Sequence, residues 1–151
     1  SNGGNRVAEL SLEVTGPDRS GLINIYRHVK GDDSILTSDT EAIEGYKKGK
    51  TVVFRLFRKD TPGTIEFYEW YNPAKGDHFY STDRSGEGKS LVGYDFVGSI
   101  GNIATVKLSD TRELFRWFKP EKGTHFYTTD PKGEGRTGDG YKYDGISGYV
   151  R

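Results

Sequence analysis

The chain of 151 residues is long enough to fold as one domain with a hydrophobic core, and too short for two domains of ordinary size. It has 22 basic and 22 acidic residues, so it carries no surplus positive charge that would attract nucleic acid. The absence of cysteine excludes disulfides and zinc-thiolate sites, and no apolar run approaches the length of about 18 residues that a membrane-spanning helix needs.

Glycine and aromatic residues dominate the rest of the composition. The 21 Gly make up about twice the usual share, beside 10 Tyr, 8 Phe and 2 Trp. Aromatic side chains fit pleated sheets and glycine supplies the positive φ angles of tight turns, so this composition predicts many short strands and no long helices. Because the sequence has neither a signal peptide nor an initiator methionine, we expect it to be a mature or excised piece of a longer chain.

Period-2 alternation and β-rich composition predict twelve strands in three groups of four. In chain order these are residues 6–14, 22–29, 34–38 and 45–48; then 51–59, 64–71, 77–82 and 93–99; then 103–109, 113–118, 124–129 and 140–150. The short connections between them leave no room for crossover helices, so the sheet is predicted to be antiparallel.

An internal repeat explains the grouping of the strands. Residues 67–83 recur as residues 114–130 with an offset of 47, and a weaker copy lies upstream, where residues 25–28 match the start of the segment and residues 34–39 its end. The copies cover about residues 6–50, 51–102 and 103–151. Self-similarity at such a period indicates repeated structural units.

Three units of four strands favour one closed all-β fold. They are too few for a β-propeller, which takes about four to eight blades, whereas three such units close into a β-trefoil, a barrel with pseudo-threefold symmetry. A linear solenoid is the alternative, but it would need distinct capping repeats at both ends, and none is visible. We therefore predict a single β-trefoil domain over residues 1–151.

The degenerate first copy separates packing positions from candidate binding positions. It carries Ile35-Leu36 where the other copies carry Phe-Tyr, so at least the Phe is expected to be core. The motif Trp is replaced by His28, and the motif His by Ser34, which cannot replace a stacking imidazole. The Trp and His are therefore binding candidates, although packing of the Trp and a structural hydrogen bond of the His remain alternatives.

The loops after each motif contain further acidic side chains. Glu87 and Glu134 each stand between two glycines, where a carboxylate can accept hydrogen bonds from a ligand, or simply face solvent. Asp39, Asp83 and Asp130 follow a strand in every copy, which is typical of a side chain that caps the next turn.

These residue types suit carbohydrate, because a sugar ring has one apolar face for an aromatic side chain and hydroxyls for polar or acidic partners. Weak single sites would gain effective affinity for a polyvalent surface by repetition. The predicted binding residues are Trp70, Asp77, His78, Tyr80 and Glu87 in the second copy, and Trp117, His125, Tyr127 and Glu134 in the third.

No catalytic signature accompanies these residues. The sequence contains no nucleophile elbow, no HExxH and no EF-hand spacing, so a non-catalytic module without metal or cofactor is predicted. A metal site made of histidines alone would require His28, His78 and His125 to point toward one axis. The alternative function is a protein-docking or inhibitor module of trefoil fold that acts through one loop, such as residues 61–63 or 84–91.

The string Trp-x5-Gly-x-His-Phe-Tyr-(Ser/Thr)-Thr-Asp, followed by Gly-Tyr, resembles a repeat family of unknown function found in secreted and cell-surface proteins. The resemblance covers residues 64–100 and 113–151 and implies an extracellular or cell-surface location, a binding role and adjoining domains. The whole arrangement is similar to β-trefoil lectins. The Gln-x-Trp signature of ricin-type lectins does not occur, so no sugar-binding residue of that family is carried over.

Overall fold

The computed structural model of the protein describes residues 21–151, which form an all-β fold. Its strands are β1 (Leu22–Lys30), β2 (Asp33–Thr37), β3 (Val52–Phe57), β4 (Thr64–Asn72), β5 (Asp77–Ser81), β6 (Asp95–Ala104), β7 (Arg112–Lys119), β8 (Thr124–Thr128) and β9 (Lys142–Val150). Two 3₁₀ helices, η1 (Gly86–Val92) and η2 (Gly133–Asp139), precede β6 and β9. Within this part of the chain, no helix is long and apolar enough to cross a membrane.

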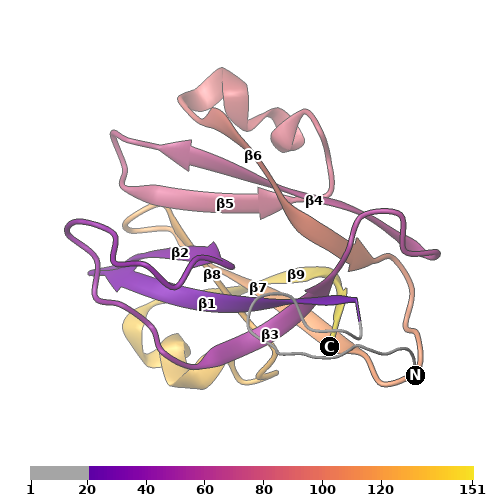
Figure 1. The fold of residues 1–151 in the computed structure, drawn as a ribbon. Helices are drawn as coiled ribbons and strands as arrows, with labels where there is room; N and C mark the ends of the chain where they lie inside the picture. The colour runs from indigo at the N-terminus through magenta and orange to yellow at the C-terminus, as the bar shows by residue number, and fades with distance from the viewer. Residues whose placement is uncertain (1–20) are drawn as a thin grey trace.

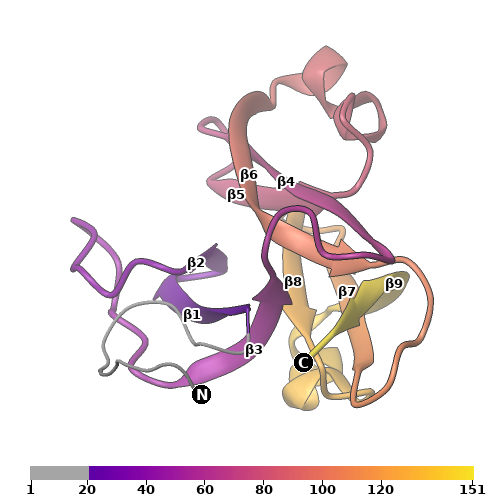
Figure 2. The ribbon, with the colours of Figure 1, turned by 45° about the vertical axis from the view of Figure 1, so that its right-hand side comes forward.

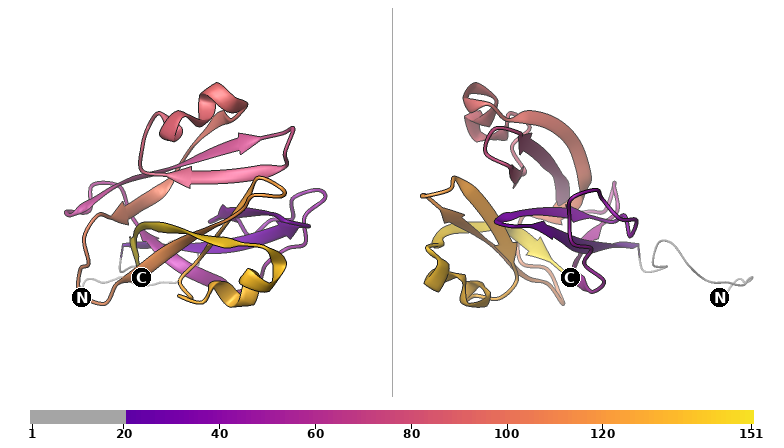
Figure 3. Two further views of the ribbon diagram at one scale, coloured as in Figure 1. Left: turned by 180° about the vertical axis from the view of Figure 1, so that it is seen from behind. Right: turned by 90° about the vertical axis from the view of Figure 1, so that its left-hand side faces the viewer.

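The strands form three units of three, which lie as separate lobes around a common centre (Figures 1 and 2). In the first unit β1 pairs with β2 and β3, in the second β4 pairs with β5 and β6, and in the third β7 pairs with β8 and β9. All these pairings are antiparallel. The helices η1 and η2 lie at the outer ends of the second and third lobes (Figure 3).

The third strand of each unit joins the units into one sheet. Phe57 of β3 pairs with Asn102 of β6, and Ala104 of β6 pairs with Tyr149 of β9. The end of β9 returns to β3, because the backbones of Arg55 and Arg151 exchange two hydrogen bonds of 2.7 and 3.0 Å. The three units are therefore held together by main-chain contacts as well as by side chains.

The core lies where the units meet, and each of the nine strands contributes to it. Its buried residues are Ile25, Leu36, Phe54, Leu56, Phe67, Tyr80, Ile103, Leu114, Tyr127 and Val150. Smaller clusters lie inside the second and third lobes, around Trp70 and Trp117. Each unit supplies only some of the buried side chains, so the central core forms only when all three units are present.

The predicted all-β antiparallel fold is confirmed, but each unit has three strands within residues 21–151 and not four. The predicted strand 45–48 is only an isolated bridge between Val29 and Lys47. The stretch 51–59, expected in the second copy, supplies β3, which pairs with β1 of the first unit. The predicted strand 6–14 lies outside the described residues.

The predicted strand 103–109 is also wrong. Strand β6 continues to Ala104, and a turn follows in which the Thr111 backbone N–H donates to Leu108 O at 3.2 Å and Asp110 takes a positive φ of 59°. The sequence analysis ended the preceding strand at residue 99, five residues before the end of β6. Gly98 and Gly101 flank register shifts of β6 against β4, as at β-bulges.

Two tyrosine hydroxyls link the second strands of the units at the centre. Tyr127 Oη accepts from Tyr80 N at 2.7 Å and donates to Tyr80 O at 2.9 Å, joining β8 to β5. Tyr80 Oη accepts from Leu36 N at 2.8 Å, joining β5 to β2, and donates to Glu69 at 3.0 Å. Burial raises the pKa of both phenols, so both keep the proton that they donate.

Removing one of these hydroxyls tests their structural role. Tyr127→Phe leaves the buried N–H and C=O of Tyr80 without this partner, and it is expected to lower the free energy of unfolding by about 1–3 kcal/mol. Urea denaturation measures the change. The matched control is Tyr143→Phe, which removes a hydroxyl from an exposed ring and is expected to change little. Equal stability of the two variants would contradict the structural role.

Candidate functional site

The motif histidines bind a carboxylate from the preceding unit. Asp33 of the first unit accepts from the His78 backbone N–H at 3.1 Å and from its Nδ1 at 2.9 Å. Asp77 of the second unit accepts from the His125 backbone N–H at 2.7 Å and from its Nδ1 at 2.6 Å. All four side chains are buried. Each aspartate therefore fixes the start of the next unit's second strand.

The tyrosine of each Gly-Tyr pair strengthens the same connection. Tyr46 donates to Asp33, and Tyr94 donates to Asp77 at 2.6 Å. Burial and these carboxylates raise the pKa of both phenols, which keeps them neutral donors. In the third unit Tyr141 instead pairs with the hydroxyl of Thr124 at 3.1 Å. In each unit the tyrosine of the Gly-Tyr pair thus contacts the first residue of the second strand.

The motif tryptophans are covered and do not present a stacking face. Trp70 is 5% exposed and Trp117 is 6% exposed. Gly86 of η1 and Gly133 of η2 lie against their rings so closely that a β-carbon would come within 2.6 and 2.8 Å of an indole carbon. Neither indole N–H has a hydrogen-bond partner among the described residues, so packing holds both rings in place.

Seven of the nine predicted binding residues are buried, and ligand binding by them stays a prediction that the structure does not test. They are Trp70, Asp77, His78, Tyr80, Trp117, His125 and Tyr127. Their side chains are used in packing or in hydrogen bonds between units. The sequence left packing of the Trp and a structural hydrogen bond of the His as alternatives to binding. The structure favours both alternatives.

The remaining two predicted residues, Glu87 and Glu134, are each 39% exposed and bridge neighbouring units. Glu87 accepts from Ser81 Oγ at 2.7 Å and pairs with Arg116 at 3.0 Å, while Glu134 pairs with Arg27 at 3.1 Å. Burial raises the pKa of Glu87, but the hydrogen bonds from Arg116 and Ser81 outweigh it, so the net shift is downward. Both carboxylates remain reachable from solvent.

Two exposed aromatic rings lie beside the buried tryptophans and are missing from the predicted set. Phe96 of β6 is 40% exposed, and its ring packs edge-on to Trp70 at 5.1 Å. Tyr143 of β9 is 55% exposed and packs in the same way on Trp117 at 5.6 Å. The two rings are 47 residues apart in the sequence, so they occupy equivalent places in the second and third units.

Each exposed ring has a half-buried aromatic neighbour on the adjacent strand. Tyr68 of β4 lies 5.9 Å from Phe96, and Phe115 of β7 lies 6.2 Å from Tyr143, measured between ring centroids. We call Tyr68–Phe96 and Phe115–Tyr143 the outer aromatic pairs. The guanidinium of Arg84 lies 3.9 Å from the centroid of the Phe96 ring. Among residues 21–151, no such cation lies over Phe115 or Tyr143.

The sequence contained a signal for the outer aromatic pairs. The 47-residue offset relates Tyr68 to Phe115, inside the repeated segment, and Phe96 to Tyr143, outside it. The first copy keeps Tyr26 at the first of these positions but has Lys48 at the second. A search restricted to the most similar residues selects the packing positions, because packing demands the same side chain in each unit.

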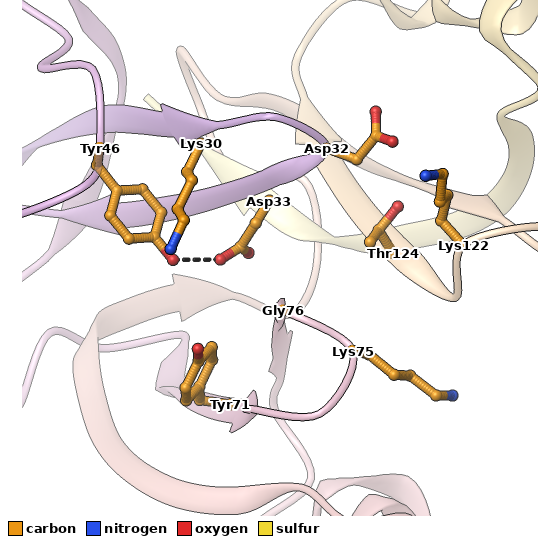
Figure 4. Close-up of a pocket in the computed structure, with 9 residues that line it drawn as sticks. All are labelled: Lys30, Asp32, Asp33, Tyr46, Tyr71, Lys75, Gly76, Lys122 and Thr124. Carbon is orange, nitrogen blue, oxygen red and sulfur yellow. Dashed lines mark hydrogen bonds between the residues drawn. The ribbon is translucent and has the colours of Figure 1, made fainter.

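A pocket of about 230 Å³ lies where the three hairpin turns β1–β2, β4–β5 and β7–β8 approach one another (Figure 4). It is lined by Lys30, Asp32, Asp33, Tyr46, Tyr71, Lys75, Gly76, Lys122 and Thr124. We call it the axial pocket. Two of these residues, Asp33 and Tyr46, also take part in the hydrogen-bonded contact with His78.

Within residues 21–151 no group of three or more His, Asp and Glu side chains is placed to hold a metal ion. His28 is engaged by the backbone of its own unit, since its Nδ1 accepts from Gly49 N at 2.9 Å and its Nε2 donates to Asp39 O at 3.1 Å. The three histidines therefore serve three separate structural contacts.

Residues 19–151 match a family described as a domain of unknown function (DUF5648), and the chain belongs to this family. No curated protein and no solved structure matches the chain. The family description assigns no activity.

The close approach of Gly86 to Trp70 can be tested with a matched pair of variants. Gly86→Ala places a methyl group 2.6 Å from the indole, whereas Gly88→Ala, at a similar positive φ, meets nothing within 4 Å. Both share the backbone penalty of the left-handed region. Gly86→Ala is therefore expected to lose about 1–3 kcal/mol more unfolding free energy than Gly88→Ala, from overpacking.

Chemical denaturation followed by tryptophan fluorescence measures both variants. A red shift of the native emission is expected only for Gly86→Ala, because a displaced η1 admits water to the indole. Equal destabilisation without a spectral change in either variant would show that η1 does not cover Trp70.

Proposed function

We propose that this domain is a non-catalytic carbohydrate-binding module with equivalent shallow sites in the second and third units, acting in secreted or cell-surface proteins. The observation that supports the proposal is the repetition of the outer aromatic pairs. Phe96 and Tyr143 expose large apolar rings at equivalent positions of two units, and exposed aromatic groups of this kind are typical of binding surfaces.

The neighbourhood of each ring supplies polar groups as well as an apolar face. Gly86 lies against the Trp70 indole on which Phe96 packs, and Arg84, two residues earlier in the loop that carries Glu87, lies over the Phe96 ring. The Arg84 guanidinium lies 3.9 Å from the centre of that ring, so a sugar that stacks on this face displaces it and can then accept hydrogen bonds from it. An aromatic face beside a carboxylate and a guanidinium suits a sugar, whose ring has an apolar side and whose hydroxyls both donate and accept hydrogen bonds.

The three units are proposed to form a β-trefoil. Three observations support this arrangement: the second strands β2, β5 and β8 approach one another in every pairwise combination, the third strands β3, β6 and β9 do the same, and equivalent contacts pass from unit to unit. Lys119 of the third unit also pairs with Asp32 of the first, at 3.4 Å. Pseudo-threefold closure would hold the two aromatic sites at a fixed separation.

Two sites held at a fixed separation allow two weak contacts to combine into tighter binding. A single shallow site is expected to bind with a Kd in the millimolar range, or about −4 kcal/mol. Simultaneous contact of both sites with a polysaccharide or a glycan-bearing surface raises the effective affinity through high local concentration. The partners proposed are therefore polyvalent glycans and not single soluble sugars.

One observation favours the alternative function, docking to a protein through a single loop. Leu91 is 88% exposed and Val92 58% exposed at the end of η1, where the third unit has Gly138 and Asp139. Two apolar side chains presented by one unit alone are typical of a partner contact that does not use the repeat. They lie in or beside the 84–91 loop that the sequence suggested for docking.

A double variant tests the carbohydrate proposal. Phe96→Ala/Tyr143→Ala removes both exposed rings and is expected to abolish binding on a glycan array or to insoluble polysaccharide, while the domain stays folded. The matched control is Ile65→Ala/Val106→Ala, which truncates two other exposed apolar side chains and should bind normally. Trp70→Ala/Trp117→Ala is expected to unfold the domain, since each buried ring contributes about 3–5 kcal/mol.

The alternative predicts the opposite pattern. Leu91→Ser/Val92→Ser would then abolish capture of the partner protein, with Phe96→Ala/Tyr143→Ala unaffected. Folded protein that binds no neutral or acidic glycan on the array would contradict the carbohydrate proposal.

A further inference from the structure

The loops beside the two outer aromatic pairs share one backbone and differ in one side chain. The Asp83 carboxylate accepts from two backbone N–H groups of its loop at 2.9 and 3.0 Å, and Asp130 accepts from the two equivalent groups, both at 2.9 Å. The first residue of η1 and that of η2 have the same positive φ of 67°. The residue after the aspartate, however, is Arg84 in the second unit and Pro131 in the third.

The Arg84 side chain lies over the outer aromatic pair of its own unit. The central carbon of its guanidinium is 3.9 Å from the centroid of Phe96 and 5.6 Å from that of Tyr68. Arg84 is exposed to solvent. In the part of the chain that the structure describes, its guanidinium forms no ion pair and no hydrogen bond, so its N–H donors face water and are available to a ligand.

The acidic side chains of the same loop do not neutralise Arg84, because other groups engage them. Asp83 holds the loop backbone and also accepts from the hydroxyl of Ser85 at 2.8 Å. Glu87 pairs with Arg116 of the third unit at 3.0 Å. The second outer aromatic pair therefore has a positive charge beside it that the loop itself leaves uncompensated.

The third unit has no guanidinium at the equivalent place. Pro131 has an apolar side chain without a donor. Lys132 follows it and Lys142 precedes Tyr143 in the chain, yet neither ammonium lies over the rings of the third outer pair. The Tyr143 ring, which is 55% exposed, is thus open to a ligand without the release of a cation.

A ligand that stacks on Phe96 has to displace the Arg84 guanidinium from the ring. A neutral sugar loses this cation–π contact and gains only hydrogen bonds to uncharged hydroxyls. A sugar that carries a carboxylate or a sulfate can pair with the displaced guanidinium in a bidentate, charge-assisted geometry, which is stronger than a neutral hydrogen bond. The exchange therefore favours an acidic sugar at the second site.

We propose that Arg84 makes the two sites selective for different sugars: the second site binds a sugar that carries an oxyanion, a carboxylate or a sulfate, and the third site binds a neutral sugar. This inference rests on the carbohydrate-binding function proposed above and names the ligand class of each site. A polysaccharide that contains both acidic and neutral sugars would contact both sites at once, and its overall affinity would exceed that of either sugar alone.

NMR titration of the folded domain, followed at the ring signals of Phe96 and Tyr143, measures each site separately. The probes are two matched sets, based on glucose and on galactose, each as the methyl glycoside, the uronate and the 6-sulfate. Inorganic sulfate is the control for charge alone. The Phe96 signals are expected to respond to the uronate or the 6-sulfate with an affinity about tenfold higher than to the methyl glycoside. The Tyr143 signals should respond to the methyl glycoside at least as strongly as to the acidic forms.

The two acidic forms identify the source of the oxyanion. A response of Phe96 to the uronates alone identifies a carboxylate, and a response to the 6-sulfates alone identifies a sulfate ester. Either response supports the proposal.

Exchanging the loop residues tests the role of Arg84. Arg84→Pro gives the second unit the residue of the third, and Arg84→Gln removes only the charge. Both are expected to weaken acidic sugars at Phe96 by about tenfold and to leave the methyl glycosides unchanged or tighter. Pro131→Arg is expected to strengthen acidic sugars at Tyr143. The matched control Arg58→Gln removes an exposed guanidinium elsewhere and should change the affinities by less than about twofold.

The outcomes separate this inference from the function on which it rests. Equal affinity of Phe96 for neutral and acidic sugars, or equal weakening by Arg84→Gln and Arg58→Gln, would overturn selection by Arg84 and leave carbohydrate binding standing. Shifts of Phe96 with inorganic sulfate as large as those with the acidic sugars would overturn it too, because they would assign the binding to charge alone. The absence of shifts at both rings with every sugar would overturn this inference and the carbohydrate proposal together.

Discussion

The hydrogen bonds that His78 donates to Asp33 and that His125 donates to Asp77 are the constraint on which the other features depend. Each bond joins the first residue of one unit's second strand to the backbone and side chain of the next unit. Such charge-assisted bonds between buried groups are strong, and leaving either partner unsatisfied is costly. They fix the three hairpin turns relative to one another, and this arrangement creates the axial pocket between them.

The repeated motif therefore holds the three units together, and the exposed surfaces that are open to a ligand lie outside the motif. Trp70 and Trp117 are enclosed by the glycines of η1 and η2, and each supports an exposed ring, Phe96 or Tyr143. A buried indole beneath an exposed ring limits the movement of that ring, which reduces the entropy lost when a ligand stacks on it. The same residues that hold the lobes thus shape the proposed carbohydrate sites.

Much of the fold followed from the sequence because alternation and the 47-residue offset are properties of packing. The strands near 22–29, 64–71 and 124–129 were placed within a few residues. Strand β6 was not, because Gly98 and Gly101 mark bulges inside a strand and look like a turn in sequence. The exposed rings were not selected from the sequence, since strict repetition selects residues that each unit buries, whereas Phe96 and Tyr143 are free to differ. The axial pocket is lined by residues from all three units and leaves no local pattern.

The repeated motif is interior, and the proposed ligand contacts lie at the outer aromatic pairs. NMR spectra of the aromatic side chains during titration with a bound glycan test this most directly. The ring signals of Phe96 and Tyr143 are expected to shift and broaden, while the two indole N–H signals stay protected from exchange and unchanged in position. Large shifts of the indole signals, with Phe96 and Tyr143 unaffected, would show that the tryptophans open to the ligand and would contradict the account.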